Sequence, residues 1–165
     1  MSFWNQNRSL SFPASVYNEP AGFEAALVTM RKALTEGVTG SRRYYMVGEW
    51  AASEAGTPTF QMDWTQTTPN FDCYYTFLPL FSEAYGFIKN TNVLINRIDD
   101  IEWESEEERN AILAEGYWHR AYWYYWLVNA YGDVPFVGEE VQGAKLDYYT
   151  HGRWTILDQI QSDME

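Results

Sequence analysis

The stretch AEGYWHRAYWYYWLVNAYGDVPFV, residues 114–137, decides the fold of this chain. Seven Tyr and Trp residues lie between Tyr117 and Trp126, and the stretch then stops at a Gly-Asp-Val-Pro sequence. Because its apolar residues cover nearly every face of a helix, the pattern is typical of a helix buried between neighbours. Gly132 can adopt the left-handed conformation that ends a helix, and Pro135 prevents its continuation. We therefore expect a central helix with interior rings, and recognition on the loops that it supports.

The start of this helix is marked by Ser105, with Glu108 three residues later. That spacing is a capping box, in which the serine side chain accepts a hydrogen bond from the backbone of the first turn. The three consecutive glutamates at 106–108 also favour the positive end of the helix dipole. The helix should therefore span about 26 residues, or ~39 Å at the usual rise per residue.

Residues 18–37 predict the first helix of the chain, because their apolar side chains recur at helical spacing. Asn18 or Glu19 can cap it, and Pro20 is well tolerated in its first turn. Gly37 fits its C-terminal stop.

Residues 79–100 predict a second long helix with one apolar face. Only a short acidic link separates it from the aromatic helix, so these two should form an antiparallel hairpin. A weaker helical pattern covers residues 41–56, and a last helix begins near Gly152 or Arg153. No segment shows convincing strand alternation. The fold class is therefore all-α, an array of antiparallel helix pairs with long irregular loops.

Composition excludes several classes of partner. The chain has 165 residues, of which 46% are hydrophobic and 18% aromatic, with a formal net charge of −12. Nucleic acid and anionic membrane surfaces are poor partners, because both need clustered Lys and Arg. The single cysteine, Cys73, allows no internal disulfide, and with two scattered histidines it makes no zinc-site spacing. We expect no cofactor and no metal, and no apolar run approaches the length of a membrane span.

The same residues carry a resemblance to a known family. Residues 114–137 resemble the SusD/RagB segment that reads roughly Ala-Glu, Arg-Ala, Tyr, Leu and then Tyr-Gly-Asp-Val-Pro. Residues 80–99 are similar to the helix that precedes it in that family, and residues 148–165 to the segment that follows. The matching positions of the first two segments are Tyr85, Ile88, Asn92, Ile95, Ala114, Glu115, Arg120, Ala121, Tyr124, Leu127, Tyr131, Gly132, Asp133, Val134, Pro135 and Val137.

The resemblance implies α-helical proteins built on tetratricopeptide-like helix pairs. Such proteins are lipoproteins on the outer surface of Bacteroidetes-type bacteria. They capture glycans, or other nutrients, and pass them to a SusC-like TonB-dependent transporter in the outer membrane, and they are not enzymes. Because the family's chains are much longer, residues 1–165 are expected to be the N-terminal helical portion of a SusD-like domain. Contact with the membrane would be only through a lipid anchor, which we expect to be absent from residues 1–165.

Candidate binding residues follow from the chemistry of sugars. A sugar ring stacks on an exposed aromatic face while its hydroxyls find polar side chains, so loop aromatics are better candidates than the central helix. Residues 56–72 are rich in Thr and Pro and long for a loop, which marks a candidate functional segment. There Trp64 is the first stacking candidate, with Asp63 and Gln66 as polar partners. The further stacking candidates are Trp50, Tyr44 and Tyr45.

Other polar residues are assigned structural roles. Glu115 and His119 stand four apart on one helix face, which predicts a local side-chain contact. A guanidinium at Arg120 inside the apolar helix needs a carboxylate or backbone carbonyls, with Asp133 or Glu115 as candidates. His151 has no partner in the sequence pattern and is interpreted as a turn residue.

Two alternatives to glycan capture stay open. One is a tetratricopeptide-like module that binds a protein partner, expected to show a concave groove with polar anchors and no exposed tryptophan. The other is a glycoside hydrolase of helical-barrel type, which needs two carboxylates about 5 to 10 Å apart across a cleft. Glu49, Asp63 and Asp72 are the most plausible contributors, although their spacing pairs none of them.

Overall fold

The computed structural model describes residues 14–39, 77–141 and 147–165. The chain divides into two compact units, one of residues 1–30 with 83–165 and the other of residues 31–82. The described residues are mostly helical, which confirms the all-α class. Their helices are η2 (Ala14–Asn18, a 3-10 helix), α1 (Pro20–Thr39), α4 (Phe77–Arg97), α5 (Glu106–Tyr131) and α6 (Arg153–Met164). Of the second unit, the structure describes only the last part of α1 and the first residues of α4.

Helix α1 begins at Pro20, as its sequence indicates, but it does not end at Gly37. It continues to Thr39, so the predicted stop is wrong. A glycine inside a helix costs only ~1 kcal/mol relative to alanine, which does not by itself end the helix. No proline follows Gly37 at close range, in contrast to Gly132 with Pro135 behind it.

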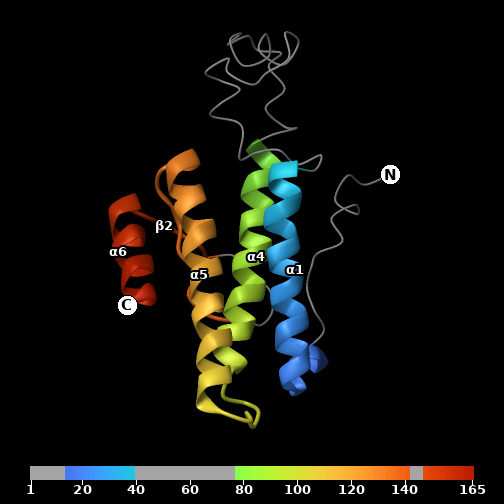
Figure 1. The fold of residues 1–165 in the computed structure, drawn as a ribbon. Coiled ribbons are helices and arrows are strands. Elements are labelled where there is room, and N and C mark those ends of the chain that lie inside the picture. The colour runs from blue at the N-terminus through green and yellow to red at the C-terminus, as the bar shows by residue number, and fades with distance from the viewer. Residues whose placement is uncertain (1–13, 40–76, 142–146) are drawn as a thin grey trace, which may run out of the picture. The chain divides into compact units, whose positions relative to one another are not determined.

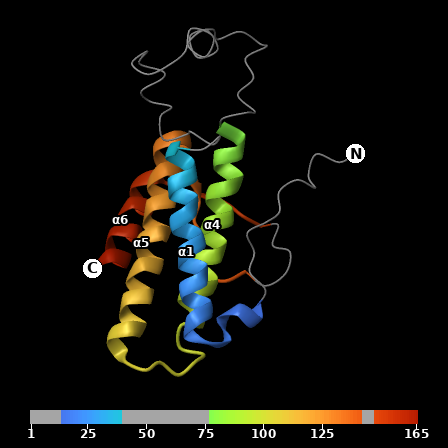
Figure 2. The same ribbon diagram turned by 45° about the vertical axis from the view of Figure 1, so that its right-hand side comes forward.

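Helices α4 and α5 form the expected antiparallel pair. They lie side by side in Figure 1, and α6 packs on α5, as Figures 1 and 2 both show. Pro79 lies in the first turn of α4, where proline is best tolerated. A Cβ atom added at Gly116 of α5 would lie 2.9 Å from the Leu94 side chain of α4. The absence of a side chain at this glycine therefore allows the two helices to approach closely.

Both predicted ends of α5 are confirmed. The Ser105 side chain accepts a hydrogen bond from the Glu108 backbone N–H at 3.1 Å. At the other end, the Gly132 N–H donates to the Val128 carbonyl at 3.1 Å. Gly132 has the expected positive φ, but its φ of 77° and ψ of −121° are the mirror image of extended backbone, not left-handed helix. That region of backbone space is open essentially to glycine alone.

The core of the first unit joins three helices. Phe23, Leu27 and Met30 of α1 pack with Leu94 of α4 and Ile112 of α5. Deeper along α5, the buried ring of Trp123 stacks on Phe87 with ring centroids 4.7 Å apart. Burial of large apolar side chains of this kind contributes roughly 1.5–3 kcal/mol each.

The expectation that all the rings of α5 are interior is wrong. Trp123 and Tyr124 are fully buried, but Trp118 is 41% exposed and Tyr125 is 56% exposed. In the described part of the chain, α1, α4 and α6 do not cover the whole circumference of α5. Helical periodicity could not show this, because a helix that is apolar on all sides does not reveal which sides find a partner.

Candidate functional site

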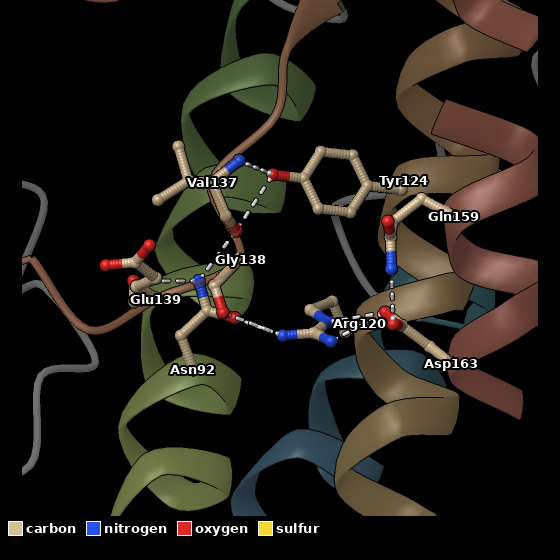
Figure 3. Close-up of polar contacts among 8 residues, drawn as sticks. All are labelled: Asn92, Arg120, Tyr124, Val137, Gly138, Glu139, Gln159 and Asp163. Atoms are coloured by element: carbon tan, nitrogen blue, oxygen red, sulfur yellow. Dashed lines mark hydrogen bonds and ion pairs between the residues drawn. The ribbon is translucent and has the colours of Figure 1, made fainter. Parts of the chain in front are cut away.

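The segment after α5 is held in place by side chains from two helices. Tyr85 donates to the Pro135 carbonyl at 2.6 Å, and Asn92 donates to the Val137 carbonyl at 2.8 Å. The Tyr124 hydroxyl accepts from the Val137 N–H at 2.6 Å and donates to its carbonyl at 3.2 Å (Figure 3). Three of the residues that carry the family resemblance, Tyr85, Asn92 and Tyr124, therefore position this segment.

The two phenols remain protonated donors over a wide pH range. Burial raises the pKa of Tyr85 and that of Tyr124 well above the usual value. The backbone hydrogen bond from Val137 lowers the pKa of Tyr124 but does not offset burial. The hydrogen bonds of these two phenols to the segment after α5 are therefore independent of pH in the physiological range.

Arg120 joins this segment to α6. Its Nε and Nη2 both donate to Asp163 Oδ2, at 3.0 and 2.6 Å. Its Nη1 donates to the Gly138 carbonyl at 3.0 Å and to Asn92 Oδ1 at 3.2 Å (Figure 3). Both charged side chains are nearly buried, with 6% and 9% exposed. The expectation of a buried, structural guanidinium is confirmed.

The carboxylates expected for Arg120, Asp133 and Glu115, were wrong. Its carboxylate partner is Asp163, which is 43 residues away in sequence. Asp133 instead accepts from the backbone N–H of Arg153 at 2.9 Å, and so satisfies a free donor at the start of α6. Glu115 Oε1 lies 3.6 Å from the Nε2 atom of His119, which confirms the local contact predicted for that pair.

His151 is not a turn residue, contrary to its interpretation from the sequence. It lies in β2 (Thr150–His151), which pairs antiparallel with β1 (Val134–Pro135). Its Nδ1 atom accepts a hydrogen bond from the Phe136 N–H at 3.2 Å.

A cavity of about 380 Å³ opens beside this β-ladder. Its lining is mainly polar and includes two loop tyrosines, Tyr148 and Tyr149, which are 46% and 73% exposed. The Tyr149 ring lies 4.9 Å from that of His151. We call this cavity the tyrosine pocket; its other lining residues include Arg120, Phe136, Glu139, Asp147 and Gln159.

A second hollow, the α5–α6 groove, is chemically different. Its volume is about 460 Å³, and its mainly apolar lining includes Trp118, Tyr122 and Tyr125 of α5 with Ile160 and Met164 of α6. The Trp118 and Tyr122 rings stack on each other at 5.2 Å. Each ring thus covers a face of the other, and few hydrogen-bonding groups lie nearby. Such a lining fits a sugar less well than the tyrosine pocket does.

The binding residues predicted from the sequence all lie outside the described residues. This applies to the stacking and polar candidates Trp64, Trp50, Tyr44, Tyr45, Asp63 and Gln66, and to the carboxylates Glu49 and Asp72. Sequence analysis missed Tyr148 and Tyr149. The signal that could have found them is the one used for Trp64, since both tyrosines follow directly on an acidic residue, Asp147.

Two further searches concern metals and membranes. Within residues 14–39, 77–141 and 147–165, no three His, Cys, Asp or Glu side chains gather closely enough to hold a metal ion. None of the helices seen there combines the length and the hydropathy that a bilayer span requires.

Comparisons with known proteins agree with the resemblance in the motif. Residues 19–165 match the SusD-like family that is described as starch-binding and associating with the outer membrane. A SusD-like protein, P25, of Formosa agariphila is 32% identical over 88 residues. That match covers 52% of this chain and 16% of the relative, so it spans only a small part of the longer protein. No solved structure matches the chain.

Proposed function

The chain belongs to the SusD-like family, described as starch-binding and associating with the outer membrane, and from this premise we propose that it binds a glycan at the bacterial cell surface. The glycan is then delivered to a SusC-like TonB-dependent transporter of the outer membrane. The activity is capture without cleavage, and no cofactor takes part. The chain acts as the N-terminal helical portion of a SusD-like domain.

The tyrosine pocket is the observation that supports glycan binding best. Tyr148 and Tyr149 have exposed rings, and Glu139, Asp147 and Gln159 line the same cavity. Pyranose binding needs this combination, because the C–H face of the sugar packs on an aromatic ring while its hydroxyls donate and accept hydrogen bonds. The pocket is also large enough for a small ligand, since ligand sites usually measure ~300–1,000 Å³.

Hydrogen bonds of Arg120 connect the elements that form the pocket. Arg120 contacts α4 through Asn92, α6 through Asp163, and the segment after α5 through Gly138. Gln159 of the pocket lining donates to Asp163 in the same network, and a group held in this way loses little conformational entropy when a ligand binds.

Residues 56–72 are proposed as a further segment that contacts the glycan. Trp64 would stack on the sugar, with Asp63 and Gln66 as its polar partners and Trp50, Tyr44 and Tyr45 nearby in sequence. We predict that Trp64→Ala weakens retention in a glycan-containing native gel and leaves helicity unchanged by circular dichroism. Unaltered mobility of this variant would remove Trp64 from the site.

The protein-binding alternative is less well supported. It was expected to lack exposed tryptophan, yet Trp154 is 72% exposed and Trp118 is 41% exposed. Incubation with a panel of polysaccharides separates the three functions. We expect retention without shortening of the polymer. Shortening of the polymer would indicate a hydrolase. If the polymer is neither retained nor shortened, that result would favour the protein-binding module.

A further inference from the structure

We infer that the tyrosine pocket selects uncharged glycans and rejects those with uronic acid or sulfate groups. This inference rests on the glycan-binding function proposed above and assigns the class of its ligand. It depends on the charged side chains that line the cavity, and not on the net charge of the whole chain.

Two carboxylates face a ligand in the pocket. Glu139 and Asp147 both line the cavity, and both are exposed. A carboxylate only accepts hydrogen bonds, and a sugar hydroxyl can donate to it in a short, charge-assisted bond. A uronate or sulfate group offers further acceptors and a like charge. The carboxylates therefore repel such a group, whereas they accept a hydrogen bond from a hydroxyl.

The guanidinium in the lining does not reverse this preference. Arg120 directs two of its nitrogens to Asp163 and the third to Asn92 and Gly138. Its charge is therefore balanced by a carboxylate that is nearly as buried as itself. The imidazole of His151 uses its Nδ1 atom to accept a hydrogen bond from the Phe136 N–H. Among the described lining residues, the uncompensated charges are those of the two carboxylates.

The expected size of the effect is moderate. Two like charges a few ångströms apart in water repel each other only weakly, and salt screens charges separated by more than ~8 Å at physiological ionic strength. Two carboxylates at such distances correspond to roughly a tenfold difference in affinity, since 1.4 kcal/mol is tenfold. The discrimination should also shrink as the salt concentration rises.

The test compares one polysaccharide backbone in two forms, dextran and dextran sulfate of equal length, beside a wider panel of neutral glycans. Dissociation constants are measured by native affinity gels at low and physiological salt. The variants are Glu139→Gln with Asp147→Asn, and the control is Glu102→Gln with Glu104→Gln, which removes the same charge from the exposed link before α5. We expect the pocket variant to gain about tenfold for the sulfated form at low salt, and the control variant to stay near wild type.

The outcomes separate the two claims. If the wild type retains no neutral glycan of the panel and no sulfated one, glycan binding itself is wrong, and charge selection is wrong with it. If the wild type retains glycans but binds the sulfated form as tightly as the neutral one, only the charge selection is wrong. Equal gains in the pocket variant and the control variant would attribute the discrimination to net charge and overturn the role of the pocket.

Discussion

Gly132 ends α5 with a backbone that other residues adopt only with strain. Its φ of 77° and ψ of −121° turn the chain from the helix into the segment that carries β1. A Cβ atom added there would lie 3.6 Å from an Arg153 nitrogen, which is an ordinary contact. The requirement for glycine is therefore conformational and does not come from lack of space.

We predict that Gly132→Val lowers the free energy of unfolding by about 1–3 kcal/mol, because a β-branched residue resists positive φ. The measurement is thermal denaturation followed by circular dichroism. Gly86→Ala is the matched control, since Gly86 lies within α4, is exposed, and has nothing within 4 Å of an added Cβ. It should raise stability by roughly 0.5–1 kcal/mol. An unshifted melting curve for Gly132→Val would show that this glycine is not needed to end α5.

At the scale of elements, the buried ion pair between Arg120 and Asp163 connects α5 to α6. Arg120 and Asp163 are 2.6 Å apart at their closest atoms, and Gln159 donates a further hydrogen bond to Asp163 at 2.9 Å. Removal of one partner leaves an uncompensated charge in a poorly solvated site. Breaking this pair should therefore loosen the packing of α6.

Asp163→Ala is expected to lower the free energy of unfolding by about 3–5 kcal/mol, the usual cost of breaking a buried pair. Urea denaturation monitored by tryptophan fluorescence gives the value. Asp99→Ala serves as the control, because Asp99 pairs with Arg109 at 2.7 Å but is 71% exposed, so its loss should change stability very little. Equal effects of the two substitutions would contradict the structural role assigned to Arg120.

Local signals in the sequence predicted most helix boundaries and few of the tertiary partners. The capping serine, the proline in the first turn of α1 and the glycine after α5 act within one or two turns, and all three were recognised. The partner of Arg120 and the strand position of His151 depend on segments that meet only after folding. Apolar periodicity failed for the exposed rings of α5, because it measures hydrophobicity and not the presence of a neighbour.

The candidate site was predictable in kind but not in position. Exposed loop aromatics beside polar residues were the expected chemistry, and Tyr148 and Tyr149 fit that description. They were not chosen from the sequence, because nothing local shows that Asp147 and Glu139 line one cavity with them. The cavity exists because α5, the β-ladder and α6 meet around Arg120.

For the molecule as a whole, the described structure separates the aromatic residues into two classes. Several rings of α5 pack in the core or line an apolar groove, and the two tyrosines of the loop before β2 are exposed beside polar groups. Family membership supports the proposed activity, and this separation gives the place where we expect it. The central claim is that the loop rings bind the glycan while the rings of α5 support the fold.

The most direct test compares two tyrosines that are both exposed. Tyr149 lies in the tyrosine pocket at 73% exposure, and Tyr125 lies in the α5–α6 groove at 56% exposure. In native gels with the retained polysaccharide, Tyr149→Ala should weaken binding about tenfold, or ~1.4 kcal/mol, through loss of a stacking face. Tyr125→Ala should bind like the wild type. Full binding by Tyr149→Ala, together with loss of binding by Tyr125→Ala, would contradict the central claim.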